Sequence, residues 1–390
     1  MRIRPDRHIL LRRDLQIVFG ITLISVIGVN SIAPALPQIA KDLRLSEGQV
    51  VMLITVFTFP GIILSPVMGI LADRFGRKRV IVPSLFLFGI AGCACAFTGD
   101  YHVLLVLRFA NGVGASALGG LNQTIIGDMF SGNGRTEALG YNASVLGVGT
   151  MIYPALGGAL ALLGWNYPFL LSALALPVAF VVLFALRNPE PGPAPPLREY
   201  LAGAARSAAD REVVPAYGAT LATFMLLYGV LLAYFPFLMH RKFGAPPSVI
   251  GLMLAATSVT TIIGAFNLGW LSRRFTPKTI IISSFIGYAA AIIMVLYADS
   301  LWLMTVPVLL YGLANGLNIP SIQTHLSGSA PMEYRGAFMS MNSMVLRLGQ
   351  TVGPVLTGFA FHQWGMEGVF LFSAIFSLLS FFLLAVFMHK

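Results

Sequence analysis

The sequence GILADRFGRKR runs from Gly69 to Arg79 and lies between two long apolar stretches. It places one aspartate and four basic residues within the segment from Asp73 to Arg79, whereas residues 48–72 and 80–98 carry no Asp, Glu, Lys or Arg. Charged side chains are costly in hydrocarbon, and basic residues gather in the short loops at a membrane surface. The stretch therefore indicates a turn between two membrane-spanning helices.

The composition agrees with a membrane protein. Of the 390 residues, 57% are hydrophobic and only 10% are charged, and the mean hydropathy is +0.81. A soluble domain carries about 25% charged residues. These values exclude a soluble globular domain, a disordered chain and a coiled coil, and two cysteines argue against a disulfide scaffold.

Twelve apolar segments of spanning length follow one another along the chain. A spanning helix needs about 20 apolar residues, and segments this long and continuous favour helices over barrel strands. The first has a basic flank but no small-residue cleavage site, so we expect a retained helix and not a signal peptide. The segments are 15–37, 48–72, 80–98, 102–128, 137–162, 166–187, 214–239, 248–271, 279–298, 302–327, 337–361 and 366–388.

The distribution of Lys and Arg predicts the orientation of the chain. Nineteen of the 25 lie on the side of the N-terminus, four lie on the opposite side, and Arg108 and Arg347 fall inside spans. Basic residues mark cytoplasmic loops. We therefore expect a multi-pass protein of the cell (inner or plasma) membrane with both termini in the cytoplasm. The net charge of +10 is then a topology signal, and nucleic acid is not an expected partner.

The chain contains an internal repeat at an offset of 200 residues. Gly69, Arg74 and Lys78 recur as Gly269, Arg274 and Lys278, and further matches run through Pro154 and Pro354. Six spans per copy give both copies the same orientation, which makes this a parallel repeat. We expect an all-α membrane protein of two six-helix bundles, 1–187 and 214–390, joined by a cytoplasmic linker, 188–213, with a short amphipathic helix.

Three segments resemble the major facilitator superfamily. The Gly69–Arg79 segment resembles its loop motif, and Arg108-Phe-Ala-Asn-Gly112 is similar to its second motif. Gly140, Gly149, Pro154, Gly157 and Gly158 have the spacing of the antiporter motif in its drug:proton antiporter branch, although Tyr153 stands where that pattern has glycine. The resemblance covers the whole chain in span count and repeat. It implies a transporter with twelve transmembrane helices, and proton-coupled efflux.

Two groups of residues are expected to serve conformational change. An interfacial cluster at the cytoplasmic ends of spans 2 and 4 could hold one conformation and loosen in another, although plain topology anchoring is the alternative. It comprises Gly69, Asp73, Gly76, Arg77 and Asp128. A second group allows bending or tight static packing of the fifth and eleventh spans, namely Gly149, Pro154, Gly158, Gly353 and Pro354.

Polar residues inside spans mark a candidate cavity, because buried polar groups are costly in a membrane. Helical spacing places several of them on shared faces, although each asparagine could instead bond a neighbouring helix. The candidates for a substrate cavity are Asn30, Asn111, Asn122, Phe224, Tyr228, Tyr311, Asn315, Asn318, Ser343, Arg347 and Gln350. His325 could titrate near neutral pH. The resemblance implies a role for Arg108 in proton coupling.

All fifteen Asp and Glu lie in loops or near span ends, so no span carries a carboxylate at mid-depth. Two hypotheses remain open. The first is a proton-coupled exporter of amphipathic or drug-like compounds that works by alternating access. The second is a transporter of anionic or zwitterionic, possibly lipid-like, solutes bound by the buried arginines. A receptor or scaffold without transport is a third class, which reconstitution in liposomes would reveal.

Nothing in the sequence points to an enzyme, because no protease, hydrolase or nucleotide-binding motif appears. We expect no cofactor and no metal, with a proton gradient as the energy source. The expected partners are a small-molecule substrate and the lipid bilayer, and the expected state is a monomer.

Overall fold

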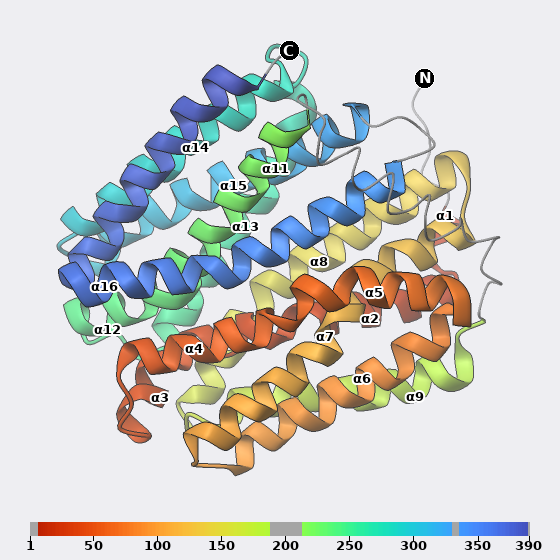
Figure 1. Cartoon of the computed structure of the whole chain (residues 1–390), viewed down its shortest axis with the longest axis horizontal. Helices are drawn as coiled ribbons and strands as arrows, with labels where there is room; N and C mark the ends of the chain where they lie inside the picture. Colours follow the sequence, from red (N-terminus) through yellow and green to blue (C-terminus); the bar gives the residue numbers. More distant parts are fainter. Residues whose placement is uncertain (1–6, 188–212, 330–334, 389–390) are drawn as a thin grey trace.

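The computed structural model describes residues 7–187, 213–329 and 335–388, and these residues are almost entirely helical (Figure 1). The predicted linker, residues 188–213, lies outside the described residues except for Val213. The prediction of an all-α membrane fold is confirmed.

The first half contains α1 (Arg7–Leu10), α2 (Arg13–Asn30), η1 (Ala33–Ala35), α3 (Leu36–Asp42), α4 (Glu47–Thr58), α5 (Pro60–Phe75), α6 (Arg77–Ala94), η2 (Cys95–Phe97), α7 (Tyr101–Met129), α8 (Gly132–Ala161), η3 (Tyr167–Leu174) and α9 (Ala175–Ala185).

The described residues after 212 form the second half. It contains α11 (Val214–Leu226), η4 (Leu227–Tyr234), α12 (Phe235–Phe243), α13 (Pro247–Leu271), α14 (Pro277–Tyr297), α15 (Leu301–Ser329) and α16 (Arg335–Phe387). η4 is a π-helix within the seventh span, and such wide turns are frequent at functional sites.

The described residues contain eleven helical segments long and apolar enough to cross a membrane. The last of them, Phe338–Phe387, holds two of the predicted spans, 337–361 and 366–388, because the backbone turns sharply at Gly365. Gly365 has φ 69°, a left-handed conformation that glycine adopts without strain. The first predicted span likewise continues from α2 through η1 into α3.

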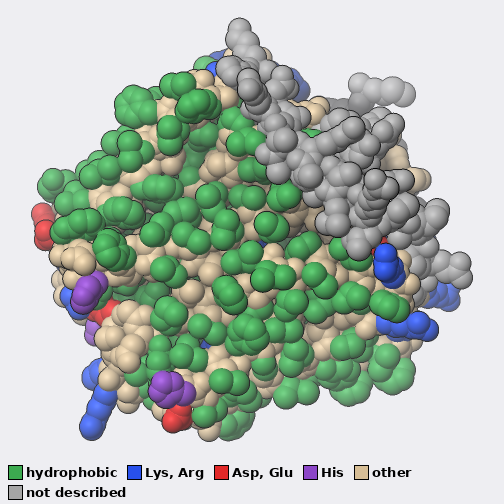
Figure 2. Space-filling view, viewed as in Figure 1, with side chains coloured by type: hydrophobic (Ala, Val, Ile, Leu, Met, Phe, Trp, Pro, Cys, Tyr) green, Lys and Arg blue, Asp and Glu red, His purple; other side chains and the backbone are tan. Residues whose placement is uncertain are grey.

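The surface is apolar where a bilayer would contact it. Figure 2 shows hydrophobic side chains across the middle of the visible face, with charged side chains toward its borders. Large apolar side chains such as Phe184, Phe266 and Trp302 are mostly exposed. An exposed apolar surface of this extent requires lipid as its solvent.

The chain reverses direction at each loop, which gives the bundle two ends. The terminal end carries α1, the α5–α6 turn at Gly76 and the end of α16, and the far end carries α3 and the α12–α13 turn (Figure 1). The two halves lie side by side, with α8 packed along α13 and α4 and α5 packed along α16.

Polar contacts join the halves from the far end to mid-depth. Glu47 of α4 pairs with Arg241 of α12 at the far end. Nearer mid-depth, the Ser258 hydroxyl donates to the Thr150 carbonyl oxygen at 3.0 Å, and the Thr351 hydroxyl donates to the Thr58 hydroxyl, also at 3.0 Å. The structure therefore has its far end closed.

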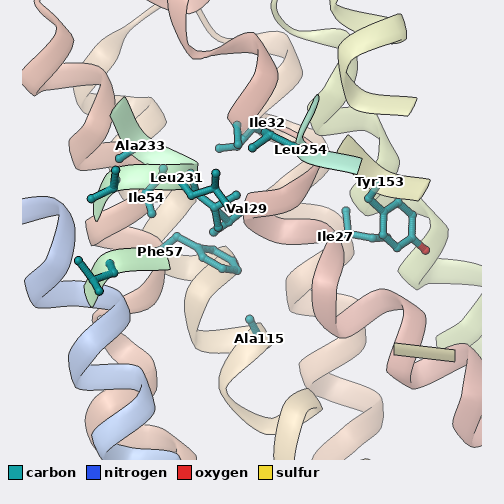
Figure 3. Close-up of a cluster of buried hydrophobic side chains, with 14 of the residues drawn as sticks. Ile27, Val29, Ile32, Ile54, Phe57, Ala115, Tyr153, Leu231, Ala233 and Leu254 are labelled. Carbon is teal, nitrogen blue, oxygen red and sulfur yellow. The ribbon is translucent and has the colours of Figure 1, made fainter. Parts of the chain in front are cut away.

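An apolar cluster lies between these contacts, and we call it the seal. Figure 3 shows its side chains converging from α2, α4, η4 and α13. All are buried, and they come from both halves: Val29, Ile32, Ile54, Leu231 and Leu254. Well-packed apolar side chains leave no room for water, so the seal separates the far end from mid-depth.

Candidate functional site

Arg347 lies at mid-depth on α16 and reaches into the first half. A Cβ atom on Gly61 of α5 would stand 2.9 Å from the Arg347 Cδ, and one on Gly119 of α7 would stand 3.3 Å from its Nη2. A larger residue at either position would make the arginine side chain shift. The guanidinium group of the second half therefore contacts two helices of the first half.

The charge of Arg347 has no carboxylate partner in the described part of the chain. Its Nη1 donates to the Gln350 Oε1 at 3.1 Å, and the ion pairs of the described residues involve only Arg77 and Arg241 as cations. A guanidinium has five N–H donors and stays protonated. Donors therefore remain for a ligand with an anionic or carbonyl group.

Aromatic side chains stand beside Arg347. Tyr228, in the π-helix η4, lies near Arg347, and its ring centroid lies 6.5 Å from that of Phe224. An apolar ring beside a fixed cation and an amide can orient an amphipathic molecule. Among the predicted cavity residues, these four (Phe224, Tyr228, Arg347 and Gln350) lie together and form the candidate site.

Arg108, by contrast, is buried inside the first half with 1% of its surface exposed. Its Nε donates to the Leu53 carbonyl oxygen and its Nη1 to the Asn111 Oδ1, each at 3.1 Å. The guanidinium also lies 4.3 Å from the centroid of the Phe57 ring. A carbonyl, an amide and an aromatic face thus stabilise this cation, and its predicted role in coupling stays a prediction.

The predicted asparagines are buried within their own halves. In the first half, Asn111 donates to the Phe88 carbonyl oxygen at 2.7 Å and Asn122 to the Thr22 hydroxyl at 2.9 Å. The second half has equivalent contacts, in which Asn315 accepts from the Tyr288 hydroxyl and Asn318 donates to the Thr223 hydroxyl. These amides join helices within one half in this conformation, and a substrate contact by them stays a prediction.

The remaining predicted polar residues are scattered. Asn30 donates to the Val26 carbonyl oxygen of its own helix, and Ser343 is exposed and bonds the Met339 carbonyl oxygen. The Tyr311 ring lies 4.9 Å from the Tyr288 ring in the second half. His325 is half-buried near the terminal end of α15. None of these four contacts Arg347.

The predicted interfacial cluster is assembled at the terminal end. The Arg77 guanidinium contacts Asp73 on the preceding turn, and its Nε lies 3.0 Å from the Asp128 Oδ2 at the end of α7. Gly76 has φ 97°, which lets the chain turn between α5 and α6, whereas a Cβ on Gly69 would meet nothing within 4 Å. The structure brings Asp73, Arg77 and Asp128 together, and their conformational role stays a prediction.

We expect Asp73→Asn to lower transport several-fold without unfolding the protein. Arg77 keeps Asp128 as a partner, so its buried charge stays paired, while the loss of one carboxylate shifts the balance between conformations. The measurement is initial uptake into liposomes beside the melting temperature. Arg74→Gln, which removes an exposed charge from the same helix, is the control, and a well-folded Asp73→Asn protein with normal uptake would reduce the cluster to a topology anchor.

The glycines and prolines predicted for bending lie in tight helix contacts. A Cβ on Gly353 would stand 2.5 Å from the Met225 carbonyl oxygen, and one on Gly149 would stand 2.8 Å from the Val26 side chain. α8 runs continuously through Pro154, as α16 does through Pro354. Close packing is therefore present, and bending stays a prediction.

Apart from Arg347, sequence reasoning did not identify the residues that join the halves. Gly61 and Gly119 have no polar group to mark them, and only their position at the depth of Arg347 could have signalled a contact. Glu47 and Arg241 are two of many charged loop residues, and nothing in the sequence pairs them. The described residues contain no group of three His, Cys, Asp or Glu side chains that could hold a metal ion.

A helical bundle in two repeated halves, with a polar site at mid-depth between them, is the architecture of a secondary transporter. The family model described as Major Facilitator Superfamily matches residues 18–239 and 216–390. The chain therefore belongs to the major facilitator superfamily. As a member of this family it is a transporter and not an enzyme, and it needs no cofactor.

The curated relatives are bacterial exporters and resistance proteins. Multidrug resistance protein 1 of Bacillus subtilis (strain 168) is 27% identical, with 89% of each chain covered. Tetracycline resistance protein, class C, of Escherichia coli is 24% identical, with 88% of each chain covered. The bacillibactin exporter of Bacillus subtilis (strain 168) is 25% identical over 95% of each chain. These relatives support a drug efflux transporter.

Solved transporter structures share the fold. A bacterial homologue of the human lysosomal transporter Spinster, in an inward-facing and occupied conformation, superimposes with a TM-score of 0.80 at 19% identity, covering 99% of this chain and 98% of that one. A D-xylose–proton symporter gives 0.77 at 17% identity, covering 96% and 97%.

Proposed function

We propose that this protein is a proton-coupled exporter of small amphipathic or drug-like compounds, that it works by alternating access, and that it acts as a monomer in the cell membrane. The observation that carries the proposal is the closed far end above a mid-depth site between two repeated halves. The terminal end, which has most of the Lys and Arg residues, is assigned to the cytoplasm, and the far end to the outside. A site closed to the outside accepts its substrate from the cytoplasm.

The halves 1–187 and 214–390 are proposed to rock against each other about this site. The contacts that would have to separate for outward opening are the Glu47–Arg241 pair, the seal and the α8–α13 packing. The contacts within each half, such as those of Asn122 and Asn318, would persist. Rigid halves with a separable interface are what alternating access requires.

The first experiment measures transport driven by a pH gradient. Purified protein in liposomes should accumulate a fluorescent amphipathic drug when the compartment opposite the cytoplasmic side of the protein is acidic, and a protonophore should abolish the accumulation. Liposomes without protein are the control. A protein that moves no solute under any gradient would instead be a receptor or scaffold, and leakage without saturation would indicate a pore.

A second candidate function is transport of anionic or zwitterionic solutes. It is favoured by Arg347, whose guanidinium at mid-depth has Gln350 as its hydrogen-bond partner and no carboxylate among the described residues. The two candidates share the fold and the site and differ in whether the substrate must carry an acidic group. Binding of an acid and of its neutral ester to the Arg347→Gln protein separates them.

A further inference from the structure

The ion pair at the far end differs from a typical surface salt bridge. The Glu47 Oε1 lies 2.5 Å from the Arg241 Nη2, and this pair joins the two halves, whereas both ion pairs of Arg77 lie within the first half. The Glu47 side chain is only 12% exposed, while that of Arg241 is 54% exposed. A mostly buried carboxylate is thus held by a cation that water reaches from the far side.

Apart from Arg241, the surroundings of Glu47 offer its carboxylate few polar partners. Its Oε2 is buried and has no hydrogen-bond partner among the described residues, and the same holds for the hydroxyl of Tyr234. Arg241 lies 5.6 Å from the centroid of the Phe361 ring, which in turn lies 5.3 Å from that of Tyr234. The negative charge therefore depends on Arg241, because a buried charge that loses its partner is strongly unfavourable.

Among the described residues, no other titratable side chain at this end forms an ion pair with Glu47. Tyr234 of η4 is uncharged and lies near Glu47, and Tyr101 of α7 donates its hydroxyl to the Gln49 carbonyl oxygen. His240 and Lys242 of α12 contact the Ala245 and Leu296 carbonyl oxygens. The remaining charged and histidine side chains at this end are exposed on α3, α7, α16 and the far-end loops: Lys41, Asp42, Arg44, Asp100, His102, Asp299, His362 and Glu367.

We propose that Glu47 is a proton-binding site open only to the outer, far side, and that a proton there releases Arg241 and lets the far end open. The proton passes from outer water to a Glu47 carboxylate oxygen and returns by the same way. Arg241 stays protonated, so the pair changes from neutral to a net charge of +1. The uncompensated cation, already half exposed, is then better placed fully in water, which separation of the halves allows.

Two observations confine this site to the far side. The seal of Val29, Ile32, Ile54, Leu231 and Leu254 lies between Glu47 and the mid-depth site and is apolar and buried. The exposed part of Arg241 is at the far-end surface. A proton at Glu47 therefore does not reach the cytoplasm in this conformation. The site goes beyond the proposed function, because it senses outer acidity and does not itself drive transport.

The test is a distance measurement across the far end. Spin labels are placed at Gly99 and Ser300, both exposed on far-end loops of opposite halves, in a protein whose Cys93 and Cys95 are replaced by alanine. We expect the long-distance population to rise at least threefold between pH 8 and pH 5. In Glu47→Gln the long distances should dominate at both pH values.

We expect the far end of the Arg241→Gln variant to respond to pH in the opposite direction to that of the parent protein. In Arg241→Gln the carboxylate of Glu47 has lost its cation, so at pH 8 it should drive the far end open to become hydrated, and at pH 5 protonation should close it. A static salt bridge predicts instead that both variants open the far end equally and without pH dependence. Glu367→Gln, an exposed carboxylate at the same end, is the matched control and should respond like the parent protein.

Three results would overturn the proposal: a parent protein with no pH response, a normal response in Glu47→Gln, or no sign reversal in Arg241→Gln. Melting temperatures of each variant confirm that it is folded. The outcome is separate from the proposed function, on whose alternating access this inference rests. Drug uptake with a pH-insensitive far end would refute the inference alone, whereas a pH-responsive far end without uptake would refute the transport proposal alone.

Discussion

Gly158→Ala is expected to reduce transport at least about fivefold while the protein remains folded. A Cβ at this position of α8 would stand 2.3 Å from the Pro247 carbonyl oxygen and 3.2 Å from the Gly251 Cα of α13. Both are backbone atoms, so no side-chain rotation relieves the clash. The far end could then close only if α8 and α13 moved apart.

The size of this effect follows from the cost of overpacking, which is about 1–3 kcal/mol for added methyl or methylene groups. Because about 1.4 kcal/mol changes an equilibrium tenfold, closure of the far end would become about 5- to 150-fold less favourable. The open conformation does not bear this cost, since the clash is between the halves. The variant should therefore accumulate in the open state.

The measurement combines uptake into liposomes with the spin-label distance between Gly99 and Ser300. The matched control is Gly140→Ala, on the same helix, where a Cβ would meet nothing within 4 Å. Gly157→Ala makes a useful contrast. Its Cβ would meet the Ser31 carbonyl oxygen at 1.9 Å within the first half, so this substitution should lower the stability of the protein and not the balance between its conformations. Normal uptake by Gly158→Ala would show that this closed arrangement is not part of the transport cycle.

The fold was predictable because its signals are local and strong. The charged Gly69–Arg79 segment separates two apolar stretches, and the structure places a turn there at Gly76. The two predicted spans after residue 336 are two separate helices that meet at Gly365, where the backbone leaves the helical conformation. Membrane-spanning helices must satisfy their backbone within each segment, so segment length and hydropathy are sufficient to identify them.

The site was less predictable because it depends on which neighbour each helix face meets. Helical spacing predicted Asn111 and Asn122 on one side of α7, but it could not show that they bond Phe88 of α6 and Thr22 of α2 in the same half. Arg347 was identified by its cost in a membrane. Its reach to Gly61 and Gly119 depends on the approach of two helices distant in sequence.

Arg347→Gln is expected to weaken binding of acidic ligands about 30- to 5,000-fold, if such ligands are the substrates. Truncating one partner of a buried charge pair costs about 2–5 kcal/mol, and each 1.4 kcal/mol is tenfold in affinity. The glutamine keeps hydrogen-bonding capacity but not the charge. A neutral ligand of the same shape should lose much less, because the Phe224–Tyr228 aromatic pair is unchanged.

The measurement compares an amphipathic aromatic acid with its methyl ester, using the rise in melting temperature that a bound ligand produces. Arg347→Lys is the matched variant: it keeps the charge but lacks the planar guanidinium fork, so it should bind the acid with intermediate affinity. If the parent protein prefers the ester or a cationic analogue, and Arg347→Gln binds all of them as the parent does, the acidic-substrate hypothesis is wrong. The exporter of neutral or cationic compounds then remains, with Arg347 serving the contact between the halves at Gly61 and Gly119.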